Sequence, residues 1–230
     1  MKKWKIDKYT VATFIAVLFH VSGFIGMFTS KYQWFVANTP LNLLVMFSLL
    51  IWTHKGKNRP FFIFVFICFG IGMITEIIGV NTSLLFGRYK YGKVLGPGVL
   101  NVPWLIGLNW FTVMYCSGVV VAHVHRRIER VSSSAESLLT PKLRLFSFIF
   151  DAALLATFFD WVLEPVAVKL GYWQWLGDGS IPFSNYLCWF LISGFLLTVF
   201  KLLSFEKHNQ FAVHLLIIEL LFFGALRTFL

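Results

Sequence analysis

The sequence is poor in charged residues, and it contains few acidic residues in particular. Asp, Glu, Lys and Arg make up 13% of the 230 residues, about half of the roughly 25% in an ordinary soluble domain. Hydrophobic residues make up 58%, and 27 Phe and 9 Trp are among them. A water-soluble domain of this size could not bury so much apolar surface, and a disordered chain would not contain it. The composition therefore excludes both classes and indicates a membrane protein.

Cysteine is scarce as well, and several enzyme signatures are missing. Cys68, Cys116 and Cys188 lie far apart in apolar stretches without CxxC spacing, so we interpret them as small apolar residues. His123 and His125 are two residues apart and cannot share a helix face, and the sequence lacks the His clusters of membrane di-iron oxygenases. It also lacks an Asp-rich pair for Mg²⁺-diphosphate and a dinucleotide-binding glycine fingerprint. We therefore expect no metal and no redox cofactor.

Seven apolar segments are long enough to cross a membrane, which takes about 20 residues for a core of about 30 Å. They are about 10–29, 36–53, 61–80, 99–123, 145–164, 183–204 and 211–229. The second is the weakest, because Asn38, Pro40 and Asn42 crowd its start. The first is long for a signal peptide and no A-x-A site follows it, so we expect an uncleaved span. The last contains no Lys that could bind retinal, which excludes a rhodopsin.

The fold class predicted by this pattern is all-α. We expect one polytopic transmembrane helix bundle of about seven spans, occupying residues 1–230 as a single domain. The formal net charge of +10 arises from 20 Lys and Arg and 10 Asp and Glu. With the N-terminus inside, 14 of the 20 basic residues lie in inner loops and 6 in outer loops, as the positive-inside rule requires. The charge thus reflects topology, and we expect no nucleic-acid partner.

The expected location is the bacterial or archaeal cell (inner) membrane, with a cytoplasmic N-terminus and the C-terminus outside. Three of the outer basic residues, Arg88, Lys90 and Lys93, lie in one loop, 81–98. Such a cluster on the outer side indicates either a functional loop or a span count that is wrong by one.

The segment 124–144 is polar, rich in Ser and closed by Pro141. We expect it to be a cytoplasmic connection between two repeat-like halves, about 61–123 and 145–204. Three blocks occur in the same order in both halves, which favours a duplicated helix–loop–helix unit over chance similarity in a chain rich in Phe and Leu. The corresponding blocks are Glu76 and Glu164, then Gly87-x-Tyr89-x-Tyr91 and Gly171-x-Trp173-x-Trp175, then VPWLIGLNWF (102–111) and IPFSNYLCWF (181–190).

Five of the ten acidic residues lie in or at the ends of apolar segments, where ionisable groups are costly and often functional. Asp160 and Glu164 are four residues apart and share a helix face. Two close carboxyl groups in an apolar setting allow a protonated acid beside an ionised partner, which general acid–base catalysis needs. With Glu76, at the end of the third segment, they are the predicted catalytic residues. The alternative is that these acids form ion pairs with Arg88 or other basic residues of the loops.

The other two acids of the apolar segments are weaker candidates. Asp151 lies nine residues before Asp160, on roughly the opposite helix face, and we expect it to contact Arg144 or to pack between helices. Glu219 is in the middle of the last segment, and His214, five residues away, is not aligned with it.

Aromatic, amide and basic residues near these acids are the predicted substrate-binding set. The rings either stabilise a cation through their faces or form an aromatic belt at the membrane interface. The two amides either hold a water molecule or bond to helix backbone. The set comprises Arg88, Tyr89, Tyr91, Asn109, Trp110, Trp173, Trp175, Asn185 and Trp189.

Several of these segments resemble the integral-membrane carotenoid biosynthesis family, which includes carotenoid 1,2-hydratases of the bisanhydrobacterioruberin hydratase type and γ-carotene 1′-hydroxylating enzymes. The resemblance extends from about 61 to 204 and is strongest in TEIIG, FGRYKYG and the D-x-x-x-E-P and W-x-W block. It implies addition of water to the terminal C1=C2 double bond of an acyclic or monocyclic carotenoid, within membrane lipid and without a cofactor. It assigns no catalytic residue; protein partners are unknown.

This chemistry agrees with the residues. Protonating an unactivated alkene to a tertiary carbocation needs a strong acid in a dry, aromatic-lined pocket, and water must then reach one face of the cation. A membrane carotenoid cyclase would use the same protonation, but an internal double bond would capture the cation. A non-enzymatic carotenoid- or lipid-binding protein or a transporter is the third possibility, since repeated halves suit transport as well.

Overall fold

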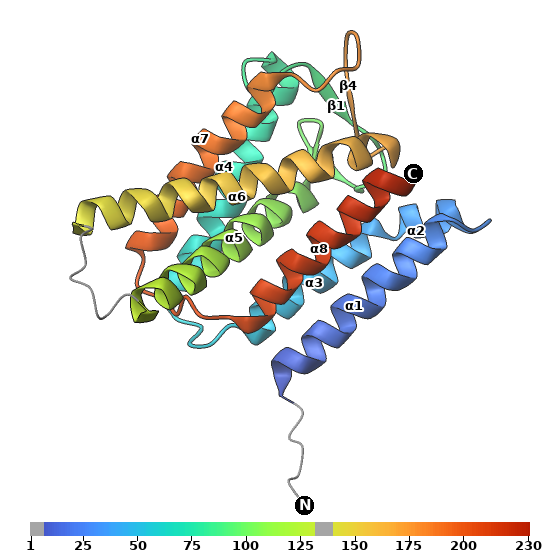
Figure 1. The fold of residues 1–230 in the computed structure, drawn as a ribbon. Helices are drawn as coiled ribbons and strands as arrows, with labels where there is room; N and C mark the ends of the chain where they lie inside the picture. Colours follow the sequence, from blue (N-terminus) through green and yellow to red (C-terminus); the bar gives the residue numbers. More distant parts are fainter. Residues whose placement is uncertain (1–6, 132–139) are drawn as a thin grey trace, which may run out of the picture.

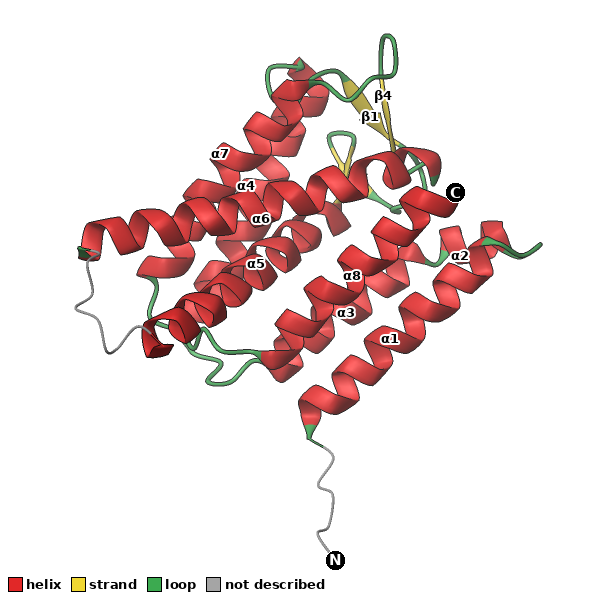
Figure 2. Ribbon diagram, viewed as in Figure 1, coloured by secondary structure: helices red, strands yellow, loops and turns green. Residues whose placement is uncertain are grey.

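A computed structural model describes residues 7–131 and 140–230. Over these residues the chain is all-α, as predicted, with four short strands added at one end (Figures 1 and 2). The helices are α1 (Lys8–Met27), α2 (Tyr32–Ala37), α3 (Thr39–Thr53), α4 (Arg59–Thr82), α5 (Trp104–Val131), α6 (Pro141–Lys169), α7 (Phe183–Leu202) and α8 (Gln210–Phe229). The strands are β1 (Tyr89–Tyr91), β2 (Gly98–Val99), β3 (Val102–Pro103) and β4 (Trp173–Trp175).

Six described helices, α1 and α4 to α8, are long and apolar enough to cross a membrane. The protein is therefore an integral membrane protein, but the predicted count of seven spans differs at 36–53. That segment folds as α2 and the 15-residue α3, whose length of about 22 Å is less than the about 30 Å of a hydrocarbon core. Pro40 has no N–H to donate and is tolerated only in the first turn of a helix, so a new helix begins at Thr39.

α3 still carries the chain from one end of the bundle to the other. At its start, the Thr39 hydroxyl lies 2.8 Å from the Tyr172 hydroxyl, beside β4. At its end, the Trp52 carbonyl accepts a hydrogen bond from Lys8, the first residue of α1. We call the end of the bundle with β1 and β4 the hairpin end, and the end with loops 54–58 and 203–209 the opposite end (Figure 1).

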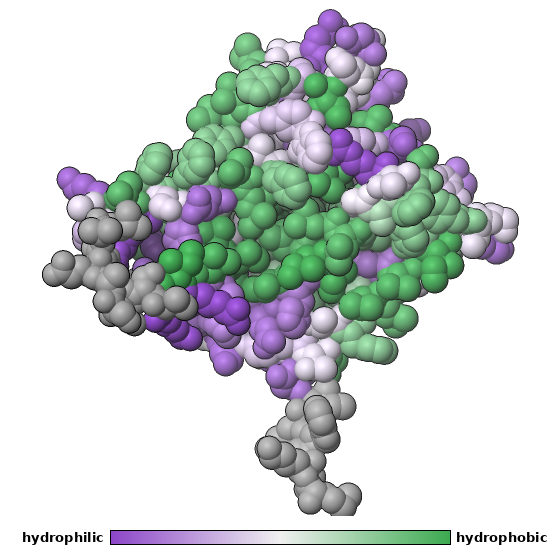
Figure 3. All heavy atoms as spheres, in the orientation of Figure 1, coloured by the Kyte–Doolittle hydropathy of each residue, from purple (hydrophilic) through white to green (hydrophobic). Residues whose placement is uncertain are grey.

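α5 lies at the centre of the bundle. In the apolar part of α5, 83% of the residues are buried inside the protein. In the other candidate spans this share does not exceed 39%. The outer helices present large apolar side chains outward, as Phe66, Phe146 and Leu221 do with exposed fractions of 72%, 63% and 69%. Figure 3 shows this surface as a broad apolar area. In water such a surface would drive aggregation, whereas in a bilayer it contacts lipid.

β1 and β4 join the loop after α4 to the loop after α6. They pair antiparallel, with Tyr89 opposite Trp175 and Tyr91 opposite Trp173. The chains approach so closely that a Cβ at Gly92 would lie 2.0 Å from the Gly171 carbonyl oxygen. The predicted corresponding positions of the two halves thus meet in one sheet, although duplication itself remains a prediction.

The predicted connection 124–144 is largely helical where the structure describes it. α5 continues to Val131 and α6 begins at Pro141. The charged stretch HVHRRIER therefore extends the helix beyond the apolar segment instead of forming a linker. Residues 132–139, and the N-terminal lysines Lys2, Lys3 and Lys5, lie outside the described residues.

A buried polar network closes the opposite end around His54. The imidazole stacks on Phe61 with ring centroids 3.6 Å apart, and its Nδ1 lies 2.7 Å from the Tyr115 hydroxyl. Asn209 donates to the same hydroxyl and to the Thr53 hydroxyl. Burial, with the nearby positive charges of Lys57 and Lys8, lowers the pKa of His54 to about 4.

We expect this network to make stability depend on pH. The pKa of His54 is lower in the folded state than the 6.5 of an unperturbed histidine, so the unfolded state binds the proton first. The stabilisation is complete above that value and is lost as the pH falls toward 4. The thermal unfolding midpoint in detergent, measured across this range, checks the expectation. His54→Gln should flatten the profile, and an unchanged slope in that variant would contradict it.

Candidate functional site

Three buried carboxyl groups face one small cavity at the hairpin end. Glu76 comes from the last turns of α4, and Asp160 and Glu164 come from successive turns of α6, with exposed fractions of 5%, 1% and 3%. The cavity has a volume of about 30 Å³, room for about one or two water molecules. We call it the carboxylate cavity. Its wall contains every predicted site residue except Arg88, together with Phe86, Ile106 and Leu163.

Glu76 accepts three hydrogen bonds from aromatic side chains. The hydroxyls of Tyr89 and Tyr91 donate to Oε2 at 2.5 and 2.7 Å, and the Trp110 indole donates to Oε1 at 3.0 Å. Burial and the Glu76 carboxylate raise the pKa of the Tyr89 and Tyr91 hydroxyls well above 10, the usual tyrosine value, so both remain protonated donors. The aromatic residues of this loop thus position a carboxylate, a role that the sequence did not reveal.

Glu164 has a matching environment. The indoles of Trp173 and Trp175 donate to Oε2 at 3.0 and 2.9 Å, and the Asn185 amide lies 3.3 Å from Oε1. The same amide donates to Asp160 Oδ2 at 2.9 Å. Alternate residues of a strand point the same way, so the x-aromatic-x-aromatic spacing of β1 and of β4 directs two donors from each strand to the carboxylates.

Indole rings form another part of the wall. Trp110 and Trp189 stack face to face, with centroids 4.1 Å apart and an interplanar angle of 9°. Trp110 can lie this close to α4 because position 72 is glycine: a Cβ on Gly72 would be 2.5 Å from the indole ring. The small residue on α4 thus sets where Trp110 meets both Glu76 and Trp189.

The carboxylates do not form the ion pairs that were the alternative prediction. The described residues contain two ion pairs, His125–Asp151 and Glu129–Arg144, and neither lies in this cavity. Arg88 is exposed and does not line the cavity. Successive residues of an extended chain point to opposite sides, so Arg88 points outward because the next residue, Tyr89, points inward. The assignment of Arg88 to the substrate-binding set is therefore not retained.

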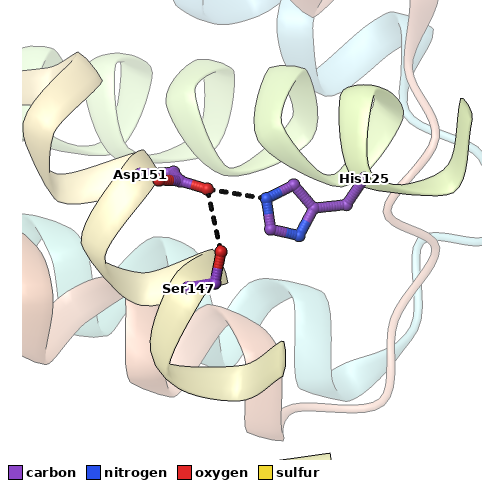
Figure 4. Close-up of polar contacts among 3 residues, drawn as sticks. All are labelled: His125, Ser147 and Asp151. Atoms are coloured by element: carbon purple, nitrogen blue, oxygen red, sulfur yellow. Dashed lines mark hydrogen bonds and ion pairs between the residues drawn. The ribbon is translucent and has the colours of Figure 1, made fainter. Parts of the chain in front are cut away.

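Asp151 connects α5 to α6 away from the carboxylate cavity (Figure 4). Its Oδ2 lies 2.8 Å from His125 Nε2 and accepts a hydrogen bond from the Ser147 hydroxyl at 3.2 Å. Of the two predicted roles, contact with Arg144 or helix packing, the contacts of Asp151 with His125 on α5 and Ser147 on α6 correspond to the second. Asp151 thus joins α5 to α6.

A second, larger cavity adjoins the carboxylate cavity. It has a volume of about 330 Å³, and its wall is mostly apolar. We call it the apolar cavity. The two cavities have Ile106, Asn109, Leu163 and Trp173 in common, so an elongated molecule in the larger one would point an end toward the carboxyl groups.

The apolar cavity opens on the outer surface of the bundle. Leu18, Trp34 and Leu41 line it, and more than half of each side chain is exposed. These residues come from α1, α2 and α3, whose outward surface is the one that a membrane protein turns to lipid. The apolar cavity thus opens toward lipid on one side and shares wall residues with the carboxylate cavity on the other.

Three polar residues of the apolar cavity were missed or undervalued in the sequence. His20 and Glu219 are 4% and 6% exposed, and both lie in its wall with Asn42. The Asn42 Oδ1 atom is buried without a hydrogen-bond partner among the described residues. In the sequence, the histidine nearest to Glu219 is His214, which is not aligned with it. Packing of α1 on α8 instead places Glu219 in the same cavity wall as His20.

Comparisons with known proteins identify the family of the chain. The profile of the family described as carotenoid biosynthesis protein matches residues 35–230. The chain belongs to the carotenoid biosynthesis protein family. A curated relative, bisanhydrobacterioruberin hydratase of Haloarcula japonica, is 30% identical over 125 residues, which are 52% of this chain and 37% of the relative. The match thus spans little more than a third of that relative. No solved structure matches the chain.

The match places both cavities in the context of carotenoid biosynthesis. Every residue that lines the carboxylate cavity falls within the matched region. In this carotenoid biosynthesis protein, α1 precedes the matched region yet contributes Leu18 and His20 to the apolar cavity. The family region thus contains the whole carboxylate site, and α1 completes the adjoining cavity.

Proposed function

We propose that this carotenoid biosynthesis protein adds water to the terminal C1=C2 double bond of an acyclic carotenoid end, without a cofactor. The observation that carries the proposal is a set of three buried carboxyl groups, walled by indole rings, next to an apolar cavity that opens toward lipid. The hydratase name of the Haloarcula japonica relative supports it. The substrates are an acyclic or monocyclic carotenoid and water.

Asp160 is the proposed acid. Glu76 accepts three hydrogen bonds, and Glu164 accepts three as well, which suits ionised carboxylates. Asp160 accepts one, from Asn185, and among the described residues nothing bonds to its Oδ1. Three close carboxyl groups without a cation cannot all carry charge, and Asp160 has the fewest donors to stabilise a charge. Its proton is transferred to C2 of the alkene.

The cation that forms at C1 is the species that the wall must stabilise. Indole faces attract cations, and a desolvated contact is worth about 2 kcal/mol. The stacked pair Trp110 and Trp189 presents such faces beside the carboxyl groups. The Glu76 carboxylate, fixed by its three donors, adds a negative charge whose effect is strong in a site without bulk water.

Water addition completes the reaction. The carboxylate cavity has room for water, and Asn109, in the wall common to both cavities, is placed to hold it beside the alkene end. The water oxygen bonds to C1 and its proton passes to Glu164. The Asn185 amide donates to both Glu164 and Asp160 and thus holds the two carboxyl groups close together. The proton then returns from Glu164 to Asp160 through water in the cavity, and the site is reset.

We propose the orientation predicted from the charges, with the opposite end in the cytoplasm and the hairpin end outside. The opposite end contains most of the described basic residues, as cytoplasmic loops do. They include Lys55, Lys57, Arg126, Arg127, Lys201 and Lys207. The carboxylate cavity would then lie in the outer half of a bacterial or archaeal cell membrane.

An isotope experiment tests the proposal. Membranes that contain the protein are incubated with lycopene in H₂¹⁸O or in D₂O, and the pigments are analysed by mass spectrometry. Hydration gives a product with one added water that contains ¹⁸O in the first solvent and a C–D bond in the second. A product without added water would indicate cyclisation instead: its mass equals that of lycopene in H₂¹⁸O and is greater by one H-to-D exchange in D₂O. No product from lycopene or γ-carotene would favour a binding or transport protein.

A further inference from the structure

A third cavity, of about 340 Å³, lies at the opposite end of the bundle between the last turns of α5 and the start of α8. All the ionisable side chains in its wall are basic, and they come from both segments. They are His123, Arg126 and Arg127 from α5, and His208 and His214 from the start of α8 and the residues before it. Figure 3 shows the hydrophilic residues of this end below the apolar surface. We call it the basic cavity.

The two guanidinium groups of the basic cavity form no ion pair with the acidic residues that the structure describes. Neither of the two ion pairs of the described chain involves Arg126 or Arg127. Arg126 donates from Nη2 to the Lys207 carbonyl at 3.0 Å, which orients the guanidinium without cancelling its charge. Two guanidinium groups beside one cavity repel each other, so an anion bound between them would relieve an unfavourable arrangement.

Two further features favour an anion there. The N-terminus of α8, at Gln210, lies in the wall, and the positive end of a helix dipole attracts negative charge. His214 lies 2.7 Å from the Thr13 hydroxyl through Nδ1, so α1 fixes one side of the wall. The cavity is thus a preformed cationic site built from α5 and the start of α8, and α1 supports it through Thr13.

Arginine pairs identify the class of anion. A planar guanidinium donates two parallel hydrogen bonds to phosphate oxygens, and a site with two of them suits a phosphate group. Val124 and Ile128 are four residues apart, so they share a side of α5 next to Arg127, and they are 46% and 57% exposed. Apolar side chains beside the cavity are what the acyl chains of a membrane lipid would contact.

We propose that the basic cavity binds the phosphate group of an anionic phospholipid. The acyl chains then contact Val124 and Ile128 beside the cavity, and the phosphate lies between Arg126 and Arg127. This site is separate from the carboxylate cavity and does not depend on the proposed hydration.

Native mass spectrometry of the purified full-length protein tests this proposal. The detergent-solubilised protein is incubated with phosphatidylglycerol, with phosphatidylcholine, or with inorganic phosphate, and the bound species are counted. We expect one retained phosphatidylglycerol per protein, and the double variant R126Q/R127Q to weaken its binding by about thirtyfold, as the loss of two basic contacts implies. Thermal unfolding of the variant verifies that it is folded.

The matched control removes the same charge elsewhere. Lys55 and Lys57 lie at the same end but do not line the cavity, so K55Q/K57Q should bind phosphatidylglycerol as the unaltered protein does. An equal loss in both double variants would overturn the site in favour of general electrostatic attraction. Equal retention of phosphatidylcholine would overturn it too, and binding of inorganic phosphate alone would assign the cavity to a soluble phosphate.

Discussion

Replacing Asp160 with Asn is expected to lower the rate of carotenoid hydration by at least about 100-fold, because a general acid contributes about 10²- to 10⁴-fold. The amide keeps the shape of the side chain and its contact with Asn185, but it has no proton to transfer to the alkene. The rate is measured as conversion of lycopene by membranes with equal amounts of each variant. Full activity in D160N would exclude Asp160 as the acid.

Asp151→Asn is the matched control, since the same change is made on the same helix. Asp151 contacts His125 and Ser147 and does not line the carboxylate cavity. D151N should retain activity within about twofold, with at most a small change in stability typical of a partly exposed pair. A loss equal to that of D160N would show that α6 responds to any lost carboxylate, and the assignment of the acid would fail.

Replacing Gly72 with Ala is expected to reduce both stability and activity. The new Cβ would lie 2.5 Å from the Trp110 indole, so the ring must move away from Glu76 and Trp189. Overpacking of this kind costs about 1–3 kcal/mol. Loss of the indole–cation contact, worth about 2 kcal/mol, should slow hydration by about thirtyfold. The thermal unfolding midpoint and the lycopene assay measure the two effects.

Gly70→Ala separates this effect from a general response of α4. A Cβ at Gly70 would meet nothing within 4 Å, and alanine favours a helix over glycine, so G70A should be neutral or slightly stabilising. The double variant G72A/W110F should recover stability because the smaller ring leaves room, while activity stays low without the indole N–H. Unaltered activity in G72A would contradict the role of the Trp110 position.

The sequence predicted the carboxylate cavity well because its residues follow short-range rules. Asp160 and Glu164 share a helix face through their spacing, and the alternating aromatics at 89 and 91 recur at 173 and 175. The order of blocks in the two halves indicated that these groups belong together. All the predicted site residues except Arg88 accordingly line one cavity.

What the sequence could not predict are contacts between distant helices. The partners of Glu76 and Glu164 are indole and phenol donors, where basic residues were the alternative. The spacing of the acids in the sequence is compatible with both kinds of partner. Only the pairing of β1 with β4 determines which side chains reach the carboxylates. His20 and Glu219 share a wall through the packing of α1 on α8, which no local pattern encodes.

The break at Pro40 was visible as a weakness of the second segment, yet its outcome depends on tertiary structure. Hydropathy alone describes 36–53 as one apolar run, whereas the proline allows a new helix to begin at Thr39. The short α3 leaves α2 as a separate helix whose Trp34 lines the apolar cavity. The irregularity that weakened the prediction of a span thus helps to form the opening.

The apolar cavity opens at Leu18, Trp34 and Leu41, on the surface that contacts lipid. The occupancy of the cavity therefore depends on the concentration of the ligand in the membrane. A ligand that arrives through this opening is dissolved in the bilayer and not in water. Its encounter rate follows the number of ligand molecules per lipid molecule in the same membrane, whatever the volume of the surrounding solution. Added phospholipid that mixes with the same membrane dilutes such a ligand. Ligand in one vesicle is not available to protein in another vesicle of the same suspension.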